Sequence, residues 1–183
     1  RQTVAQKKEW GIEIICISSD IIRLPMKLVQ TEITSSINSY ISVIESDYTF
    51  FTLPFHFHPE MELVYISKGF GKRIIGDKIE RFSEGDMVFI GSNLPHVWLC
   101  DKQFYKKANN ICSKAIVVYF NKCVFSSAFY HMHETLKIKE FFQKAERGIL
   151  ISGKTKTKVL QKLNRMKNKK GFDKILGLFE IFN

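Results

Sequence analysis

The sequence predicts a mainly β fold followed by an α-helical appendage, and three observations predict it. Between residues 28 and 120, short runs rich in Val, Ile, Tyr and Phe alternate with turn-forming clusters. From residue 133 onward the apolar residues recur at helical spacing instead. The hydrophobic content of 45% and the charged content of 25% are those of an ordinary globular protein.

The β region reads as an antiparallel sandwich or small barrel of about eight strands. The expected strands are SYISVI, ELVYIS, RII, MVFI, HVWL and KAIVVYF. The turn clusters between them include SKGFG, GDK, SEGD and GSNLP. Regular alternation of such runs and turns is typical of an all-β domain.

The helical region carries three apolar stripes, each with residues three or four positions apart, so we expect about three amphipathic helices. Gly148 stands where a helix C-cap is expected after the first stripe. The stripes are Ile138, Phe141, Phe142 and Ala145; Val159, Leu160, Leu163 and Met166; and Phe172, Ile175, Leu176 and Phe179.

At 183 residues, one medium domain with an appendage is expected. We place the β domain at residues 26–130 and the helical region at 131–183. Met26 resembles a natural start, so residues 1–25 are either an extraneous extension or a real N-terminal strand. The last residues break off within a helical pattern, so we expect the natural chain to continue.

The spacing of the cysteines and the hydropathy of the sequence limit which class of protein this can be. The four cysteines are widely spaced and form no C-x-x-C pair, which argues against a zinc ribbon or a disulfide framework and favours a cytoplasmic protein. No apolar run approaches the roughly 20 residues of a membrane helix, so no membrane partner is expected. The cysteines are Cys16, Cys100, Cys112 and Cys123.

The net charge of +10 is concentrated in one segment. Residues 154–170 contain eight of the 28 Lys and Arg residues and no acid, so the remaining chain has 20 basic and 18 acidic residues. A solvated face of an amphipathic helix explains the run best. Contact with DNA phosphates is the alternative.

Two short motifs look functional but are better explained structurally. The segment GILISGKT, Gly148 to Thr155, matches the P-loop pattern, but a helix precedes it and too little chain follows for a nucleotide-binding domain. We read Ser152 or Thr155 as a helix N-cap. The pair His131 and His133 has no evident third metal ligand, so a solvated loop is expected.

The stretch PFHFHPEMELVYISKGFG, residues 54 to 71, is the strongest candidate site. Residues two apart in a strand share a face, so His56, His58 and Glu62 are expected to point the same way, with Pro59 distorting the strand between them. His96 follows 34 residues after Glu62, where a neighbouring strand brings it alongside.

Three imidazoles and one carboxylate form a sensible site for Zn, Fe, Mn, Ni or Cu with open positions for a ligand. The alternative is a polar pocket in which the same side chains bind an organic ligand or water. We expect Trp98 to line the mouth of this pocket. No acid, base or nucleophile is positioned well enough to predict catalysis.

These residues resemble the two motifs of the cupin family. The segment HFHPEMELVYISKG is similar to the first motif, with His56, His58, Glu62 and a closing glycine. The segment GDMVFIGSNLPH is similar to the second and ends at His96. The resemblance implies a cupin-type double-stranded β-helix, or jelly-roll barrel, in which these four residues hold a divalent transition metal.

The second motif departs from the family pattern at three positions. Gly91 stands where proline is usual, Asn93 where glycine is usual, and Cys100 where asparagine often follows. The four metal-ligand positions are nevertheless filled.

The wider sequence from about Met26 to Asn183 resembles the N-terminal half of AraC-type transcriptional regulators. The resemblance implies a cupin domain that senses a small-molecule effector, such as a sugar-like molecule, and helices that form a homodimer. DNA would then be bound by a C-terminal helix-turn-helix domain that this sequence lacks. The alternative is a stand-alone metal-dependent cupin enzyme, such as an isomerase or dioxygenase.

Overall fold

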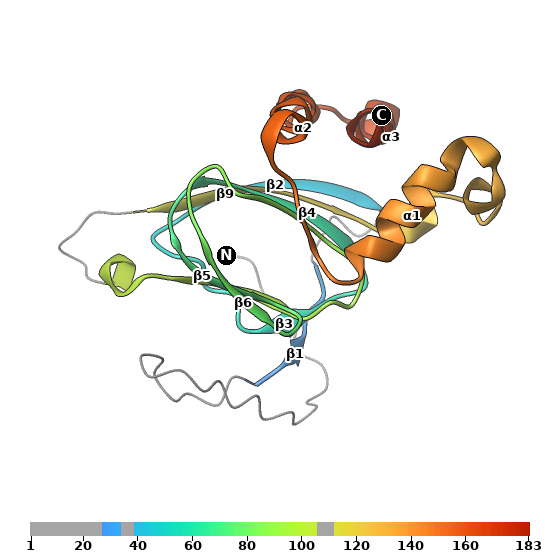
Figure 1. The fold of residues 1–183 in the computed structure, drawn as a ribbon. Coiled ribbons are helices and arrows are strands. Elements are labelled where there is room, and N and C mark those ends of the chain that lie inside the picture. The colour runs from blue at the N-terminus through green and yellow to red at the C-terminus, as the bar shows by residue number, and fades with distance from the viewer. Residues whose placement is uncertain (1–26, 34–38, 106–111) are drawn as a thin grey trace.

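Two five-stranded sheets face each other, and helices cover the outer side of one of them (Figure 1). The computed structural model describes residues 27–33, 39–105 and 112–183. The predicted mainly β fold with three helices is confirmed. Among the described residues no strand pairing joins the two sheets, so closure into a double-stranded β-helix stays a prediction.

The first sheet, called the β8 sheet, has the strand order β1-β3-β8-β5-β6. All its neighbours are antiparallel except β1 and β3. Its strands are β1 (Val29–Gln30), β3 (His56–Phe57), β8 (His96–Cys100), β5 (Gly71–Ile75) and β6 (Lys78–Phe82).

The second sheet, called the β4 sheet, has the order β10-β7-β4-β9-β2 and is antiparallel throughout. Its strands are β10 (Ile149–Leu150), β7 (Met87–Ile90), β4 (Met61–Lys68), β9 (Ser113–Phe120) and β2 (Ile41–Tyr48).

An apolar layer fills the space between the sheets. Both sheets contribute alternate residues, because side chains two apart in a strand share a face. Buried members include Val64, Val88 and Val117 from the β4 sheet and Ile75 and Trp98 from the β8 sheet.

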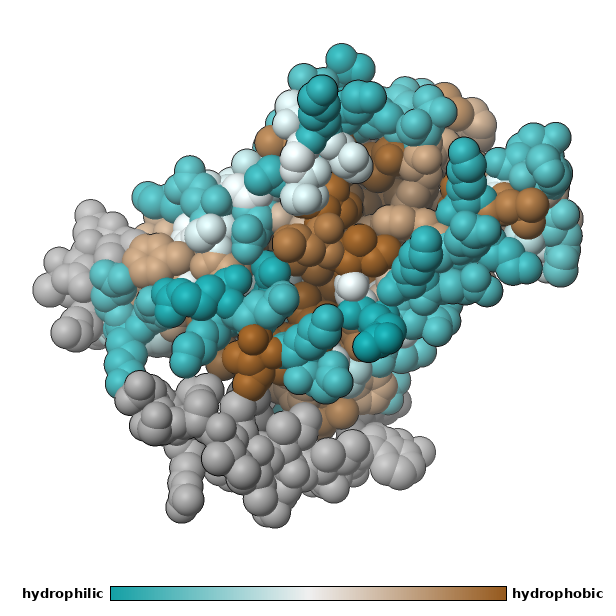
Figure 2. Space-filling model, viewed as in Figure 1, coloured by the Kyte–Doolittle hydropathy of each residue, from teal (hydrophilic) through white to brown (hydrophobic). Residues whose placement is uncertain are grey.

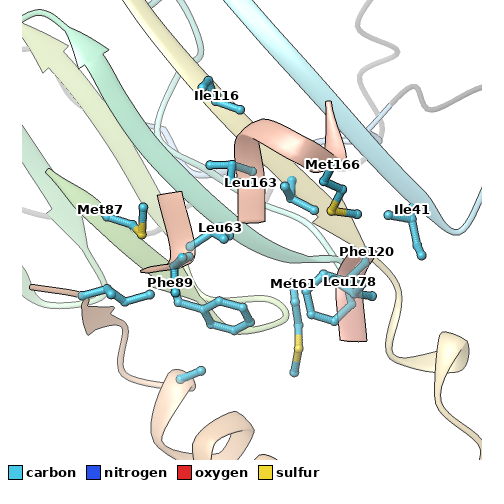
Figure 3. Close-up of a cluster of buried hydrophobic side chains, with 14 of the residues drawn as sticks. Ile41, Met61, Leu63, Met87, Phe89, Ile116, Phe120, Leu163, Met166 and Leu178 are labelled. Atoms are coloured by element: carbon cyan, nitrogen blue, oxygen red, sulfur yellow. The ribbon is translucent and has the colours of Figure 1, made fainter. Parts of the chain in front are cut away.

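The helices pack on the other face of the β4 sheet (Figure 3). Side chains such as Leu63 and Phe89 point outward there and meet Leu163, Met166 and Leu178 of the helices. Figure 2 shows apolar surface exposed between polar regions on this side. The helices are α1 (Leu136–Ala145), α2 (Gly153–Met166) and α3 (Gly171–Phe182), and 3-10 turns span Lys102–Tyr105, Lys122–Val124, Ala128–His131 and His133–Thr135.

The helical region is tied to the sheet by β10, which the sequence analysis did not predict. Ile149 and Leu150 pair with Phe89 and Val88 of β7. Residues 131–183 therefore share both a sheet and an apolar core with the β region. The predicted division at residue 130 stays a prediction, and residues 1–25 lie outside the described part of the chain.

The first two predicted stripes face the core, whereas the third does so only in part, because Ile175 packs against the core and its other residues are exposed. Phe172, Leu176 and Phe179 are 70%, 44% and 38% exposed. The buried residues of α3 are Gly177 and Leu178. The physical reason is close packing of α3 on α2: a side chain at residue 177 would meet Met166 and Lys169 at 3.1 Å.

Among the described residues, none of the helices has the length and apolar character needed to cross a membrane.

Candidate metal centre

The four predicted ligands come together at one end of the space between the sheets. His56 lies on β3 and is paired in register with His96, the first residue of β8. His58 follows β3, and Glu62 lies on β4 of the opposite sheet. All four are buried, with 3% exposure or less.

The route by which they converge differs from the predicted one. The sequence analysis placed His56, His58 and Glu62 on one face of a single strand. Instead β3 ends at Phe57, and β4 begins at Met61 in the other sheet. Pro59 lies in the crossing segment, where its missing N–H costs no ladder hydrogen bond. The histidines and the glutamate therefore face each other across the interior.

The distances are those of a metal-binding cluster. One ring nitrogen from each of His56, His58 and His96 lies within 4.8 Å of the others. Glu62 Oε2 lies 3.1 Å from His58 Nε2. The same oxygen lies 2.9 Å from His96 Nε2, an ion-pair distance whose angle falls outside hydrogen-bond geometry.

Backbone carbonyls fix the orientation of all three imidazoles. The Nδ1 atoms of His56, His58 and His96 lie 2.7, 3.2 and 2.7 Å from the carbonyl oxygens of Pro54, Glu60 and Leu94. A carbonyl can only accept, so Nδ1 carries the hydrogen in each ring. In the neutral ring the Nε2 lone pair is then free, as a metal ligand requires.

The electrostatics favour a neutral His56 and an ion pair between Glu62 and His96. Burial, followed by the charge of His96, lowers the pKa of His56 from 6.5 to about 4. Burial alone would raise the pKa of Glu62, but His96 and His58 outweigh it and hold that pKa well below its usual value. Burial likewise lowers the pKa of His96, but Glu62 outweighs it, and the pKa of His96 is raised above 6.5.

The cluster fits a divalent transition metal on its own geometry. His56 Nε2 is buried and has no hydrogen-bond partner in the described structure, which is costly unless something binds it. His56, His58 and His96 would supply three nitrogen ligands, and Glu62 an oxygen. Zn, Fe, Mn, Ni and Cu all accept this donor set. A metal bound there would polarise a ligand at an open coordination position.

Trp98 lies beside the centre, and its place at the mouth of a pocket stays a prediction. Its side chain is buried in the layer between the sheets. Its ring centroid lies 5.7 Å from that of His96. The Nε1 atom is buried and has no hydrogen-bond partner.

Tyr119 is a neighbour of the centre that sequence reasoning missed. On β9 it pairs in register with Glu62 of β4 and with Ser42 of β2. Its ring lies 5.4 Å from the ring of His58. Burial and then the Glu62 carboxylate raise the pKa of Tyr119 well above 10. The alternation of KAIVVYF indicates which residues share a face, but only the register identifies Tyr119.

The structure is consistent with a helix N-cap in the P-loop-like segment and with a solvated loop at His131 and His133. Ser152 occupies the N-cap position of α2, although its side chain makes no cap hydrogen bond. The short strand β10 lies within the P-loop-like segment rather than before it. His131 and His133 are exposed and belong to two 3-10 turns.

The basic segment has both paired and exposed cations. Lys156 Nζ donates to Gly85 O at 2.8 Å, and Lys167 and Lys169 form ion pairs with Glu45 and Glu180. The exposed cations of this segment are Lys154, Lys158, Arg165 and Lys170. A largely solvated helix face, as predicted, agrees with this arrangement.

No protein-family model and no curated protein matches the sequence. The chain is similar to a solved structure of apo ToxT K231A from Vibrio cholerae at 13% identity, covering 79% of this chain and 55% of ToxT with a TM-score of 0.47. It is similar to a cupin 2 conserved barrel domain protein from Rhodopseudomonas palustris at 17% identity, covering 61% of this chain and 76% of that protein with a TM-score of 0.35. A cupin 2 conserved barrel domain protein from Salinispora arenicola CNS-205 matches at 13% identity over 48% of this chain and 69% of its own, with a TM-score of 0.37. At these identities the similarities concern the fold, and the candidate centre rests on its own geometry.

Proposed function

We propose that this chain is the effector-sensing and dimerisation portion of an AraC-type transcriptional regulator, which would act on DNA through a helix-turn-helix domain joined to it. In this proposal a small-molecule effector binds beside the imidazole cluster. The helices on the outer face of the β4 sheet transmit the binding to a second copy of the chain.

The observation that carries this proposal is a short loop joining the centre to the helices. Asn93 N donates to His58 O at 2.8 Å, and Leu94 O accepts from His96 Nδ1 at 2.7 Å. At the start of the same loop, Gly91 N donates to Ala145 O at 2.9 Å, at the end of α1. A displacement of either histidine therefore reaches α1 through backbone hydrogen bonds.

Gly91 is suited to this connection in two ways. A Cβ at this residue would lie 2.7 Å from Ala145 O, so only glycine allows the approach. Proline, usual at this position in the motif that the segment resembles, has no N–H to donate to Ala145. The departure from the family pattern thus creates the link to α1.

A second connection runs through β4. Glu62 points into the centre, while its neighbours Met61 and Leu63 point outward into the core beneath the helices (Figure 3). Two arrangements of the centre would therefore favour two arrangements of the helices. Effector binding would shift the population between them, to the extent that it prefers one.

The complete His-His-Glu-His set favours a second candidate, a metal-dependent cupin enzyme of the isomerase or dioxygenase class. An enzyme needs the centre but does not need its occupancy to alter self-association. The two functions therefore differ in the coupling free energy between metal binding and self-association, which can be measured.

Sedimentation equilibrium with and without saturating Zn²⁺ or Mn²⁺ tests the proposal. We expect metal binding to change the dimer association constant by about fivefold or more, the usual lower range of allosteric coupling. Gly91→Ala should still bind metal but show a smaller change. Metal binding with no change in association, or turnover of a small substrate lost on His56→Ala, would favour the enzyme.

A further inference from the structure

A second feature lies against the candidate centre: a cavity of about 190 Å³. At ~30 Å³ per water in the liquid, this corresponds to roughly six waters or a ligand of similar size. The described residues that line it are Ile33, Ser39, Tyr40, Ser42, Glu60, Tyr119 and Asn121.

The cavity adjoins the imidazole cluster without containing it. Tyr119 lies between Ser42 and Glu62 across β2, β9 and β4, so it separates the cavity from the Glu62 carboxylate. Its ring also contacts His58, with centroids 5.4 Å apart. A molecule in the cavity would therefore bind beside His58 and Tyr119 rather than between the three imidazoles.

Glu60 gives the cavity an unused acceptor. Its Oε2 atom is buried and has no hydrogen-bond partner in the described structure. His58 Nδ1 lies 3.5 Å from this atom, an ion-pair distance, but the hydrogen on that nitrogen is directed to the carbonyl oxygen of Glu60, at 3.2 Å. A carboxylate oxygen left desolvated and unpaired is costly, so a donor from a bound molecule would stabilise it.

The other lining residues favour a positively charged donor on the bound molecule. The described lining contains one carboxylate and no Lys, Arg or His. The lining also includes two aromatic residues, Tyr40 and Tyr119. A carboxylate together with aromatic faces is the combination that binds ammonium groups, through an ion pair and cation–π contacts.

We propose that this cavity binds the protonated amine of a small ligand, with Glu60 as the ion-pair partner and the rings of Tyr40 and Tyr119 against the ammonium group. The hydroxyl of Ser42 would bind a polar group on the rest of the molecule, as would Nδ2 of Asn121, whose Oδ1 already accepts from Cys123 N. This inference rests on the proposed sensor function and names the chemical class of its effector. A neutral polyol would leave the charge of Glu60 unpaired, and an anion would be repelled.

Small probes of four to six non-hydrogen atoms but different charge test the proposal. Ethanolamine and 1,4-diaminobutane are titrated at pH 7, alongside neutral propane-1,2-diol and anionic propionate. Binding is followed by the amide NMR shifts of Ser42 and Asn121. We expect saturable shifts with the two amines and none with the other probes.

Glu60→Gln keeps the size of the side chain and removes its charge, and it should weaken amine binding at least tenfold. Tyr40→Leu removes an exposed ring with little risk to folding and should also weaken amine binding. Glu140→Gln, an exposed acid on α1, is the matched control and should leave binding unchanged. Unchanged amine binding in Glu60→Gln, equal binding of the diol or propionate, or no saturable shift with either amine would overturn the proposal.

The titrations are run on protein with and without metal, so that the two proposals fail separately. Amine binding without any metal binding would leave the cavity proposal standing and count against the metal-dependent sensor. Metal binding without amine binding would overturn the cavity proposal alone.

Discussion

At the residue scale, the three histidines are preorganised by the backbone. Each Nδ1 is held by a carbonyl within two residues of it, so the three Nε2 atoms are oriented before any ligand arrives. Such second-sphere contacts raise ligand affinity by fixing both ring orientation and tautomer.

Removing one imidazole should weaken metal binding strongly. Loss of a second-sphere partner alone typically costs 10–100-fold, so His56→Ala or His96→Ala should cost at least about 100-fold. His133→Ala removes an exposed histidine and serves as the control. Competition titration against a chelator of known affinity measures the change. Equal affinity in His56→Ala and His133→Ala would contradict the assignment.

The lowered pKa of His56 predicts acid destabilisation of the metal-free protein. Between pH 6.5 and about 4 the unfolded chain binds a proton at His56 that the folded chain does not. The contribution of His56 to the free energy of unfolding is therefore present above pH 6.5 and is lost as the pH falls toward 4. The shift corresponds to about 3 kcal/mol in total.

Urea unfolding at pH 7, 6 and 5 measures this loss in protein treated with chelator. His56→Asn should show a smaller loss over the same range. The contribution of His96 has the opposite sign, because its pKa is raised, and it is lost as the pH rises above 6.5. A wild-type stability that is constant from pH 7 to pH 5 would show that His56 is not buried in its neutral form.

Motif spacing predicted the four residues of the centre, because His56, His58 and Glu62 are close in sequence and His96 follows at the separation between the two motifs. It did not predict the way they converge. The alternation of side chains along a strand was applied as if His56, His58 and Glu62 lay on one strand. In the structure the chain crosses between the two sheets at Pro59. Tyr119 and the unpaired oxygen of Glu60 depend on register and desolvation, which no local pattern encodes.

At the element scale, the two connections from the centre to the helices are short. Gly91 touches the end of α1, and β4 has one face in the centre and the other in the core beneath α2 and α3. The sequence predicted the first two helical stripes because they face a large apolar sheet. The third stripe predicted a helix but not its packing, because α3 packs on α2 through Gly177, which carries no hydrophobic signal of its own.

Two leucines of α3 should therefore respond differently to truncation. Leu178 is 1% exposed and lies in the core, whereas Leu176 is 44% exposed. Leu178→Ala should lower the free energy of unfolding by about 2–5 kcal/mol, the usual cost of a buried leucine. Leu176→Ala should change it by less than about 0.5 kcal/mol. Thermal and urea unfolding compare the two, and equal losses would show that α3 is packed differently.

At the whole-molecule scale, the exposed face of α3 is where we expect a second copy to bind. Phe172, Leu176 and Phe179 present large apolar side chains to solvent, which single chains rarely leave uncovered as a group. Phe172→Ser with Leu176→Ser should weaken dimerisation at least tenfold, while Lys158→Ser, on the exposed side of α2, should not. Sedimentation equilibrium measures it. A wild-type chain that stays monomeric at high concentration would contradict dimerisation through α3.

The central claim is that residues from two facing sheets form one metal centre, and anomalous diffraction from crystals grown with Zn²⁺ or Mn²⁺ tests it most directly. We predict one strong peak, bonded to Nε2 of His56, His58 and His96, with Zn–N distances of about 2.0–2.1 Å and a Glu62 oxygen nearby. A peak at His131 and His133 instead, or no peak at the imidazole cluster in metal-saturated crystals, would contradict the claim.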